Sequence, residues 1–173
     1  MKIPLLAAAS TALLLAVAPA SAQIDDAQIA AIVVTANQVD VDAGKLAVEL
    51  SRNPAVVEFA RLMITDHTGV NEAATALVTR LRVTPMESPT STSLKQAGDE
   101  HLARLRKLEG TAFDTAYVEH EVAYHEQVIA AIDSTLIPGA TNGELKSLLV
   151  KVRPAFDAHL AHARQLLKSL TKS

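Results

Sequence analysis

The sequence predicts an all-α fold, a bundle of four long helices with one additional short helix. Apolar residues recur at alternating spacings of three and four over long stretches, which is the pattern of amphipathic helices packed against neighbours. Aromatic residues make up only 3% of the chain while alanine is abundant, and this composition favours closely packed helices over a β-sandwich or barrel. Proline, glycine and asparagine gather between the periodic stretches, where helices are expected to end.

The first two long helices are predicted over residues 25–51 and 54–82. An aspartate caps the start of the first helix, and Asn53 followed by Pro54 ends it and begins the second. Such a short connection makes the two helices antiparallel neighbours. The second helix carries a sustained seam with one polar member: Val56, Ala60, Met63, His67, Val70, Ala74, Leu77 and Leu81.

A loop and a short helix are expected between the second and third long helices. Residues 83–93 contain two prolines with several serines and threonines, which is typical of a loop. The short helix follows over residues 94–109, and Gly110 is expected to stop it. Because this helix can carry the chain back along the bundle, we expect the second and third long helices to run parallel, as in ferritin-like bundles with one crossover.

The third and fourth long helices complete the predicted bundle. The third covers residues 112–136 and repeats the seam pattern of the second. Asn142 and Gly143 separate it from the fourth helix, which contains Pro154 and is expected to kink there. The fold class predicted from the sequence is therefore a ferritin-like four-helix bundle with an additional crossover helix.

The N-terminus has the features of a secretory signal peptide. One lysine precedes an apolar run over residues 3–18, and small residues form an A-x-A site at 20–22. We predict that residues 1–22 are removed, leaving Gln23 first and residues 23–173 as a single helical domain. The mature chain is then periplasmic or secreted, and it contains no apolar run of ~18 residues that would span a membrane.

Charge and composition exclude several classes of function. The formal net charge is −3, and it becomes −4 when the one lysine of the signal peptide is removed, so a nucleic-acid partner is not expected. The chain has no cysteine, which excludes disulfides and thiolate ligands. No Ser-His-Asp order or glycine-rich phosphate loop occurs. The sequence indicates a binding protein rather than an enzyme, with an oxidoreductase as the remaining alternative.

Polar residues occupy the seams that should face the core. His67, His125 and His159 lie on the second, third and fourth long helices, and Asp40 lies at or beside the seam of the first. His67 and His125 are each about 13 residues from the start of their helices, while Asp40 and His159 are each about 11 residues from the end of theirs. With a rise of ~1.5 Å per residue, the crossover topology places all four side chains in one layer.

The register of each seam affects this prediction. His125 and His159 occupy the seam in both possible registers of their helices. In the second helix the alternative register exchanges His67 for Asp66, which is also polar. In the first helix a more apolar register places Asp40 on the flank.

Three imidazoles and a carboxylate form a plausible site for a transition metal such as Zn²⁺, Cu²⁺ or Fe²⁺. The predicted ligands are His67, His125 and His159, with Asp40 or Asp66 assisting. The alternative is a polar network, in which the same histidines are hydrogen-bonded to Asp40, Asp66 or tyrosine hydroxyls and fix the helix register without metal. Such a chain would be a structural or interaction protein of the cell envelope.

Three accessory residues accompany these candidates. Met63 lies one turn before His67 and could favour copper, although methionine at a seam position usually fills the core. Glu121 lies one turn before His125, and His162 lies one turn after His159. The full set of Glu-x-x-His pairs found in di-iron carboxylate proteins is missing.

Four segments resemble a bacterial envelope family, the domain of unknown function 4142, which is regarded as ferritin-like. The segments are ANQVDVDAGKLA at 36–47, VVEFARLMITDHT at 56–68, GTAFDTAYVEHEVAYH at 110–125 and HLAHA at 159–163. The resemblance implies a helical bundle, export to the envelope and a special role for Met63, Asp66, His67, His125 and His159. The family commonly has glutamate where this chain has Asp40 and Asp42. It has no agreed biochemical function.

Overall fold

The computed structural model describes residues 24–172, and all the regular secondary structure in this part of the chain is helical. The predicted signal peptide over residues 1–22 lies outside the described residues. Among the described helices, none combines the length and the apolar character required to cross a membrane.

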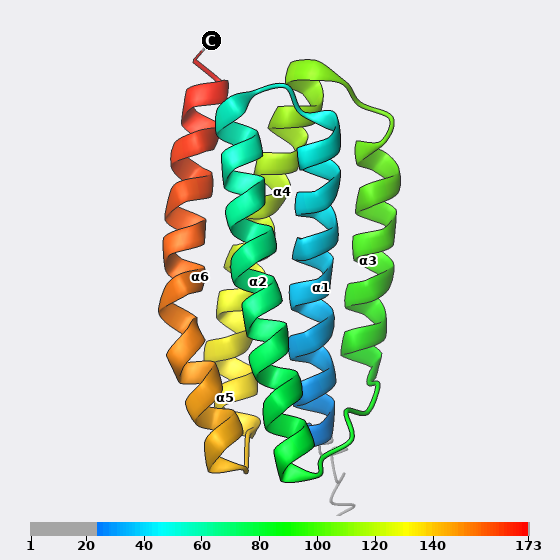
Figure 1. Ribbon diagram of the computed structural model, residues 1–173, viewed down its shortest axis with the longest axis vertical. Helices are drawn as coiled ribbons and strands as arrows, with labels where there is room; N and C mark the ends of the chain where they lie inside the picture. Colours follow the sequence, from blue (N-terminus) through cyan, green and yellow to red (C-terminus); the bar gives the residue numbers. More distant parts are fainter. Residues whose placement is uncertain (1–23, 173) are drawn as a thin grey trace, which may run out of the picture.

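Four long helices lie side by side along the length of the protein (Figure 1): α1 (Asp26–Leu50), α2 (Pro54–Leu81), α4 (Gly110–Ala131) and α6 (Gly143–Leu170). In Figure 1, α1 and α6 run upward, whereas α2 and α4 run downward. α1 packs most extensively against α2, and α4 against α6. Every pair of neighbours among the four is thus antiparallel, and α2 and α4 run parallel.

Side-chain caps explain where three of these helices begin. The Asp25 carboxylate accepts a hydrogen bond of 2.8 Å from the backbone N–H of Gln28, whose side chain accepts one from the Asp25 N–H in return. Asn53 caps α2 in front of Pro54, and Asn142 caps α6. The starts of α1 and α2 were predicted from an aspartate cap and from Asn53 with Pro54, and Asn142 was expected to precede the last long helix.

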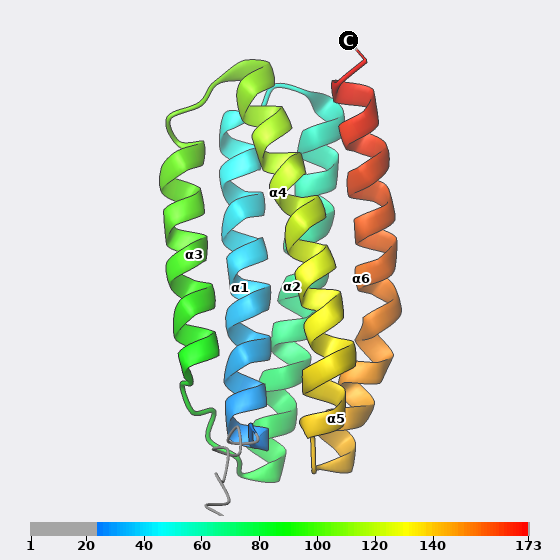
Figure 2. The same ribbon diagram turned by 180° about the vertical axis from the view of Figure 1, so that it is seen from behind.

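The crossover helix α3 (Pro89–Leu105) lies against the outer side of α1, and Figure 2 shows it from behind. It begins within the segment predicted as a loop, because Ser88 and Ser91 form a capping box in front of Pro89. It ends at Leu105, so Gly110 does not stop it. Gly110 instead begins α4 with a φ of +55°, a conformation that glycine adopts without strain.

The third long helix changes its hydrogen bonding before its predicted end. α4 is followed by a π-helical turn, η1 (Ile132–Leu136), and by the short α5 (Ile137–Gly139). Pro138 has no N–H to give to the carbonyl four residues earlier, and the N–H of Ile137 bonds to the Ile132 carbonyl five residues back. The widened turn therefore accommodates the proline without breaking the helix.

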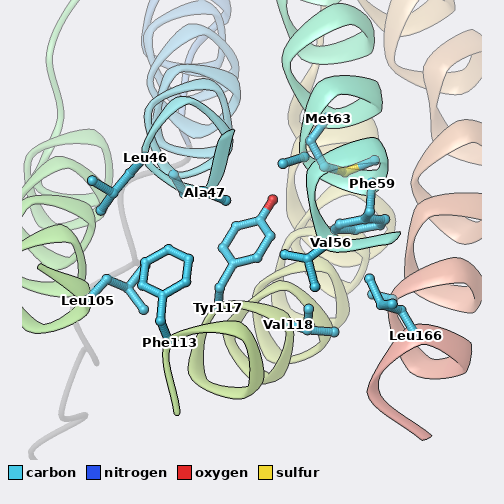
Figure 3. Close-up of a cluster of buried hydrophobic side chains, with 13 residues drawn as sticks. Leu46, Ala47, Val56, Phe59, Met63, Leu105, Phe113, Tyr117, Val118 and Leu166 are labelled. Carbon is cyan, nitrogen blue, oxygen red and sulfur yellow. The ribbon is translucent and has the colours of Figure 1, made fainter. Parts of the chain in front are cut away.

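Two apolar clusters fill opposite halves of the interior. The first joins the end of α1 to the start of α2, and ten of its side chains are labelled in Figure 3. The second includes Ile29 and Ile32 of α1, Leu77 of α2 and Leu149 of α6. On each long helix, buried polar residues occupy the positions between the two clusters. The core thus consists of two apolar halves separated by a polar layer.

Candidate metal centre

Three histidines from three long helices meet in the polar layer. His67 of α2, His125 of α4 and His159 of α6 are 1%, 0% and 4% exposed. One ligand atom of each lies within 4.8 Å of the ligand atoms of the other two. Their ring centroids are 5.2 to 5.5 Å apart. The structure therefore brings together the three predicted histidines, and their role as metal ligands remains a prediction.

Two of the imidazoles donate from Nδ1. His67 Nδ1 lies 2.7 Å from Asn37 Oδ1, and the Asn37 amide nitrogen donates to the Val33 carbonyl. The Asn37 oxygen is therefore the atom that faces His67, and it can only accept. His125 Nδ1 donates to the backbone carbonyl of Glu121 at 2.9 Å. In the neutral rings, the proton then resides on Nδ1 and the lone pair on Nε2.

The third imidazole donates from its other nitrogen. His159 Nε2 lies 2.8 Å from Asp66 Oδ2, and the Asp66 side chain is 39% exposed. Asp66 thus orients His159 from the edge of the layer. The remaining nitrogens, His67 Nε2, His125 Nε2 and His159 Nδ1, are buried and have no hydrogen-bond partner. One bonded and one bare nitrogen on each ring is the arrangement of histidines that bind metals.

Burial keeps at least two of these imidazoles neutral at physiological pH. Desolvation, followed by the proximity of His125 and His159, lowers the pKa of His67 to about 2. Desolvation likewise lowers the pKa of His125 to about 4. Phe156 packs against all three rings, with centroid distances of 5.2 to 6.1 Å. Neutral imidazole is the form that binds a metal ion.

Two buried carboxylates extend the layer. Asp40 of α1 is 2% exposed, and its Oδ2 lies 3.2 Å from His67 Nε2. Glu121 of α4 is fully buried, and its Oε2 lies 3.5 Å from His125 Nδ1. Asp40, Glu121 and His125 form a second group whose ligand atoms lie within 4.8 Å of one another. Burial raises the pKa of Asp40 to about 7, and burial followed by the Asp40 charge raises that of Glu121 well above its ordinary value.

The buried face of α1 includes both registers considered for it. Asp40 points into the core together with Asn37, while residues of the more apolar register, among them Ala36 and Ala43, are also buried. α3 covers the flank of α1, where Gly98 lies close to Val39. Because α1 is covered by the bundle on one side and by α3 on another, its apolar residues are not confined to one seam. For this reason its sequence pattern fitted two registers.

The remaining accessory residues are associated with the first apolar cluster. Met63 is fully buried in the first apolar cluster, beside Phe59 in Figure 3. His162 is exposed, and its ring packs edge-on against Phe59 with a centroid distance of 5.1 Å. Of the three accessory residues, Glu121 is the one that the structure places among potential ligands.

Sequence reasoning missed Asn37 and the contribution of Phe156. Asn37 precedes Asp40 by three residues, a spacing that places both side chains on one face of a helix, so a signal was present. The spacing of Phe156 along its helix is that of an ordinary core residue and gave no such signal. His101 and His120, which belong to neither ligand group, stack between α3 and α4 with a centroid distance of 3.5 Å.

Comparison with known proteins identifies one matching family. The sequence model of a family described as a domain of unknown function (DUF4142) matches residues 12–166, which is most of the chain. No curated protein and no solved structure matches the sequence.

Proposed function

Within the domain-of-unknown-function family DUF4142, to which this chain belongs, we propose that the protein binds a transition-metal ion through His67, His125 and His159. The observation that carries this proposal is the set of three bare, buried imidazole nitrogens in one layer. An unpaired polar atom in a core is unfavourable by about 1–3 kcal/mol. A shared ion would satisfy all three at once.

The ligand chemistry favours Zn²⁺, Cu²⁺ or Fe²⁺. Three imidazoles and the nearby Asp40 carboxylate give a nitrogen and oxygen set that suits these ions. Ligands at ~2.1 Å from a tetrahedral ion lie roughly 3.4 Å apart. A shared ion would therefore draw together the imidazole ligand atoms, which lie within 4.8 Å of one another in the metal-free structure.

We further propose that the bundle is ferritin-like. In support of this relation, the chain returns along α3, and α2 and α4 run in the same direction. The chain lacks the glutamate pattern of the di-iron proteins, so the fold relation does not extend to their chemistry.

The second candidate function is that of an envelope protein in which the histidines only fix the packing of the helices. The hydrogen bonds from His67 to Asn37 and from His159 to Asp66 favour it. It predicts no tightly held metal, and it leaves the bare nitrogens of His125 and His159 unpaired. For that reason we place metal binding first.

Metal retention tests the proposal. The purified protein is incubated with Zn²⁺, Cu²⁺ or, without oxygen, Fe²⁺, then desalted and examined by elemental analysis. We expect His125→Gln to lose the ion that the wild type retains. His162→Gln serves as the matched control, because this exposed histidine lies outside the centre, and it should retain the ion. Equal retention by wild type and His125→Gln would contradict the proposed site.

Export is a separate proposal. It rests on the predicted signal peptide of residues 1–22. After expression of the full chain in a bacterium, the envelope fraction should contain a protein whose intact mass corresponds to a start at Gln23. An uncleaved chain in the cytosolic fraction would be the contrary result.

A further inference from the structure

The two carboxylates beside the histidines have no cationic side chain to balance them. Asp40 and Glu121 are 2% and 0% exposed, and no lysine or arginine is found among the buried residues that the structure describes. Among the described residues, their ion-pair contacts are with His67 and His125. These contacts involve imidazoles and not permanently charged side chains, so no fixed positive charge lies beside the two carboxylates.

Glu121 has polar neighbours but no cation beside it. Its carboxylate oxygens are buried and form no hydrogen bond of good geometry, and the Asp40 carboxylate and the hydroxyl of Tyr117, one turn earlier, lie close enough to share a proton with it. Figure 3 shows that hydroxyl pointing into the space between α1 and α2, toward the interior. An isolated carboxylate in a core is costly unless a cation or a proton neutralises it.

We propose that a second cation binds at Asp40 and Glu121, next to the ion held by the three imidazoles, so that the polar layer holds two metal ions. This inference rests on the proposed function. Carboxylate oxygens select harder ions than imidazole does, and with a histidine adjacent the expected occupant is Mn²⁺ or Fe²⁺. The two sites thus differ in the class of ion they take.

Asp40 is positioned to bridge the two ions. Its Oδ2 is 3.2 Å from His67 Nε2, a nitrogen of the first site, and a ligand atom of Asp40 lies within 4.8 Å of one on Glu121. Paired ions with a shared carboxylate are typically 3.5–4 Å apart. His125 belongs to both groups, and since its bare nitrogen serves one ion, the carboxylates supply the ligands of the second.

Metal stoichiometry distinguishes one ion from two. The purified protein is equilibrated with Zn²⁺ and Mn²⁺ together, desalted and examined by elemental analysis and by the electron paramagnetic resonance of Mn²⁺. We expect two ions per chain in the wild type and one in Glu121→Gln, with loss of the bound Mn²⁺ signal. Glu119→Gln is the matched control, because this glutamate lies on the exposed face of the same helix. It should retain two ions.

A second variant guards against a folding defect. Asp40→Asn should also lose Mn²⁺ and keep Zn²⁺, with a helical circular dichroism spectrum like that of the wild type. If the wild type holds a single ion and His67→Gln loses it, the second site is overturned and the proposed function stands. A shared proton would then neutralise the two carboxylates in place of a second ion. Two ions in Glu121→Gln would also overturn it. Absence of any ion would overturn both proposals.

Discussion

Asn37 determines which nitrogen of His67 is available. Its Oδ1 accepts the Nδ1 proton at 2.7 Å, which leaves the lone pair on Nε2. Partners of this kind typically change metal affinity 10- to 100-fold when removed. We therefore expect Asn37→Leu to weaken zinc binding by that factor, measured by competition with a chromogenic chelator. The exposed neighbour Gln38 provides the control, and Gln38→Leu should bind zinc as the wild type does. Unchanged affinity in Asn37→Leu would show that His67 is not a ligand in this tautomer.

The buried acid Asp40 gives the metal-free protein a specific pH dependence. Its pKa is raised from 3.8 to about 7, so between these values the folded protein binds a proton that the unfolded chain has released. The free energy of unfolding therefore falls as the pH rises through this window, by up to about 4 kcal/mol. Asp40→Asn removes this contribution.

Urea unfolding in the presence of a chelator measures the effect. The free energy of unfolding of Asp40→Asn minus that of the wild type should be larger at pH 8 than at pH 4.5. Asp42→Asn, which changes a partly exposed acid on the same helix, should show no such gain. A constant difference between Asp40→Asn and the wild type at the two pH values would refute the assignment.

At the residue scale, the sequence predicted the histidines better than their partners. His125 and His159 occupied the seam in either register, and the structure places both in the polar layer. Asp66 was expected to assist the histidines, and its carboxylate bonds His159 from a partly exposed position. Spacing along a helix predicts which side chains lie on the same face. It does not predict whether a carboxylate on that face binds a metal ion directly or accepts a hydrogen bond from a histidine.

At the scale of the helices, replacing Gly98 or Gly69 by alanine should have opposite effects on stability. A Cβ at Gly98 of α3 would lie 2.7 Å from Val39 Cγ2 of α1, whereas a Cβ at Gly69 of α2 would meet nothing within 4 Å. Alanine favours helix over glycine by about 1 kcal/mol. Gly69→Ala should therefore stabilise the protein by up to that amount, and Gly98→Ala should destabilise it by roughly 1–3 kcal/mol because α3 is forced away from α1.

Thermal and urea unfolding measure both variants. Combining Gly98→Ala with Val39→Ala relieves the contact, so the double variant should be more stable than the sum of the single changes predicts. Additive effects would mean that Gly98 does not set the distance between α3 and α1.

Helix boundaries were predicted where a cap was strong and missed where it was weak. Asp25, Asn53 and Asn142 fixed three starts correctly. The start of α3 was missed because Ser88 is paired with another serine at the third position, where glutamate is the usual signal. The π-helical turn before Pro138 was also missed, since a shift in hydrogen-bond register leaves no trace in apolar periodicity.

For the whole molecule, the topology makes the polar layer possible. The long helices each contribute at least one of its buried groups: Asp40 from α1, His67 from α2, His125 from α4 and His159 from α6. These residues share a level because α3 returns the chain before α4 begins. The level estimate from the sequence agrees with this arrangement, because an α-helix rises by a nearly constant distance per residue. An ion in this layer would cross-link at least three of the long helices.

Metal binding should accordingly stabilise the entire fold. A ligand that binds only the folded state, at 100 times its dissociation constant, adds about 2.7 kcal/mol. For a domain of this size that corresponds to a rise of roughly 5–10 °C in the melting temperature. We expect Zn²⁺ to raise the melting temperature of the wild type by that amount in differential scanning calorimetry, and a chelator to reverse the shift. His162→Gln should respond in the same way, since its side chain lies outside the layer. His125→Gln should show no shift, and an equal shift in His125→Gln would mean that zinc acts at another place on the protein.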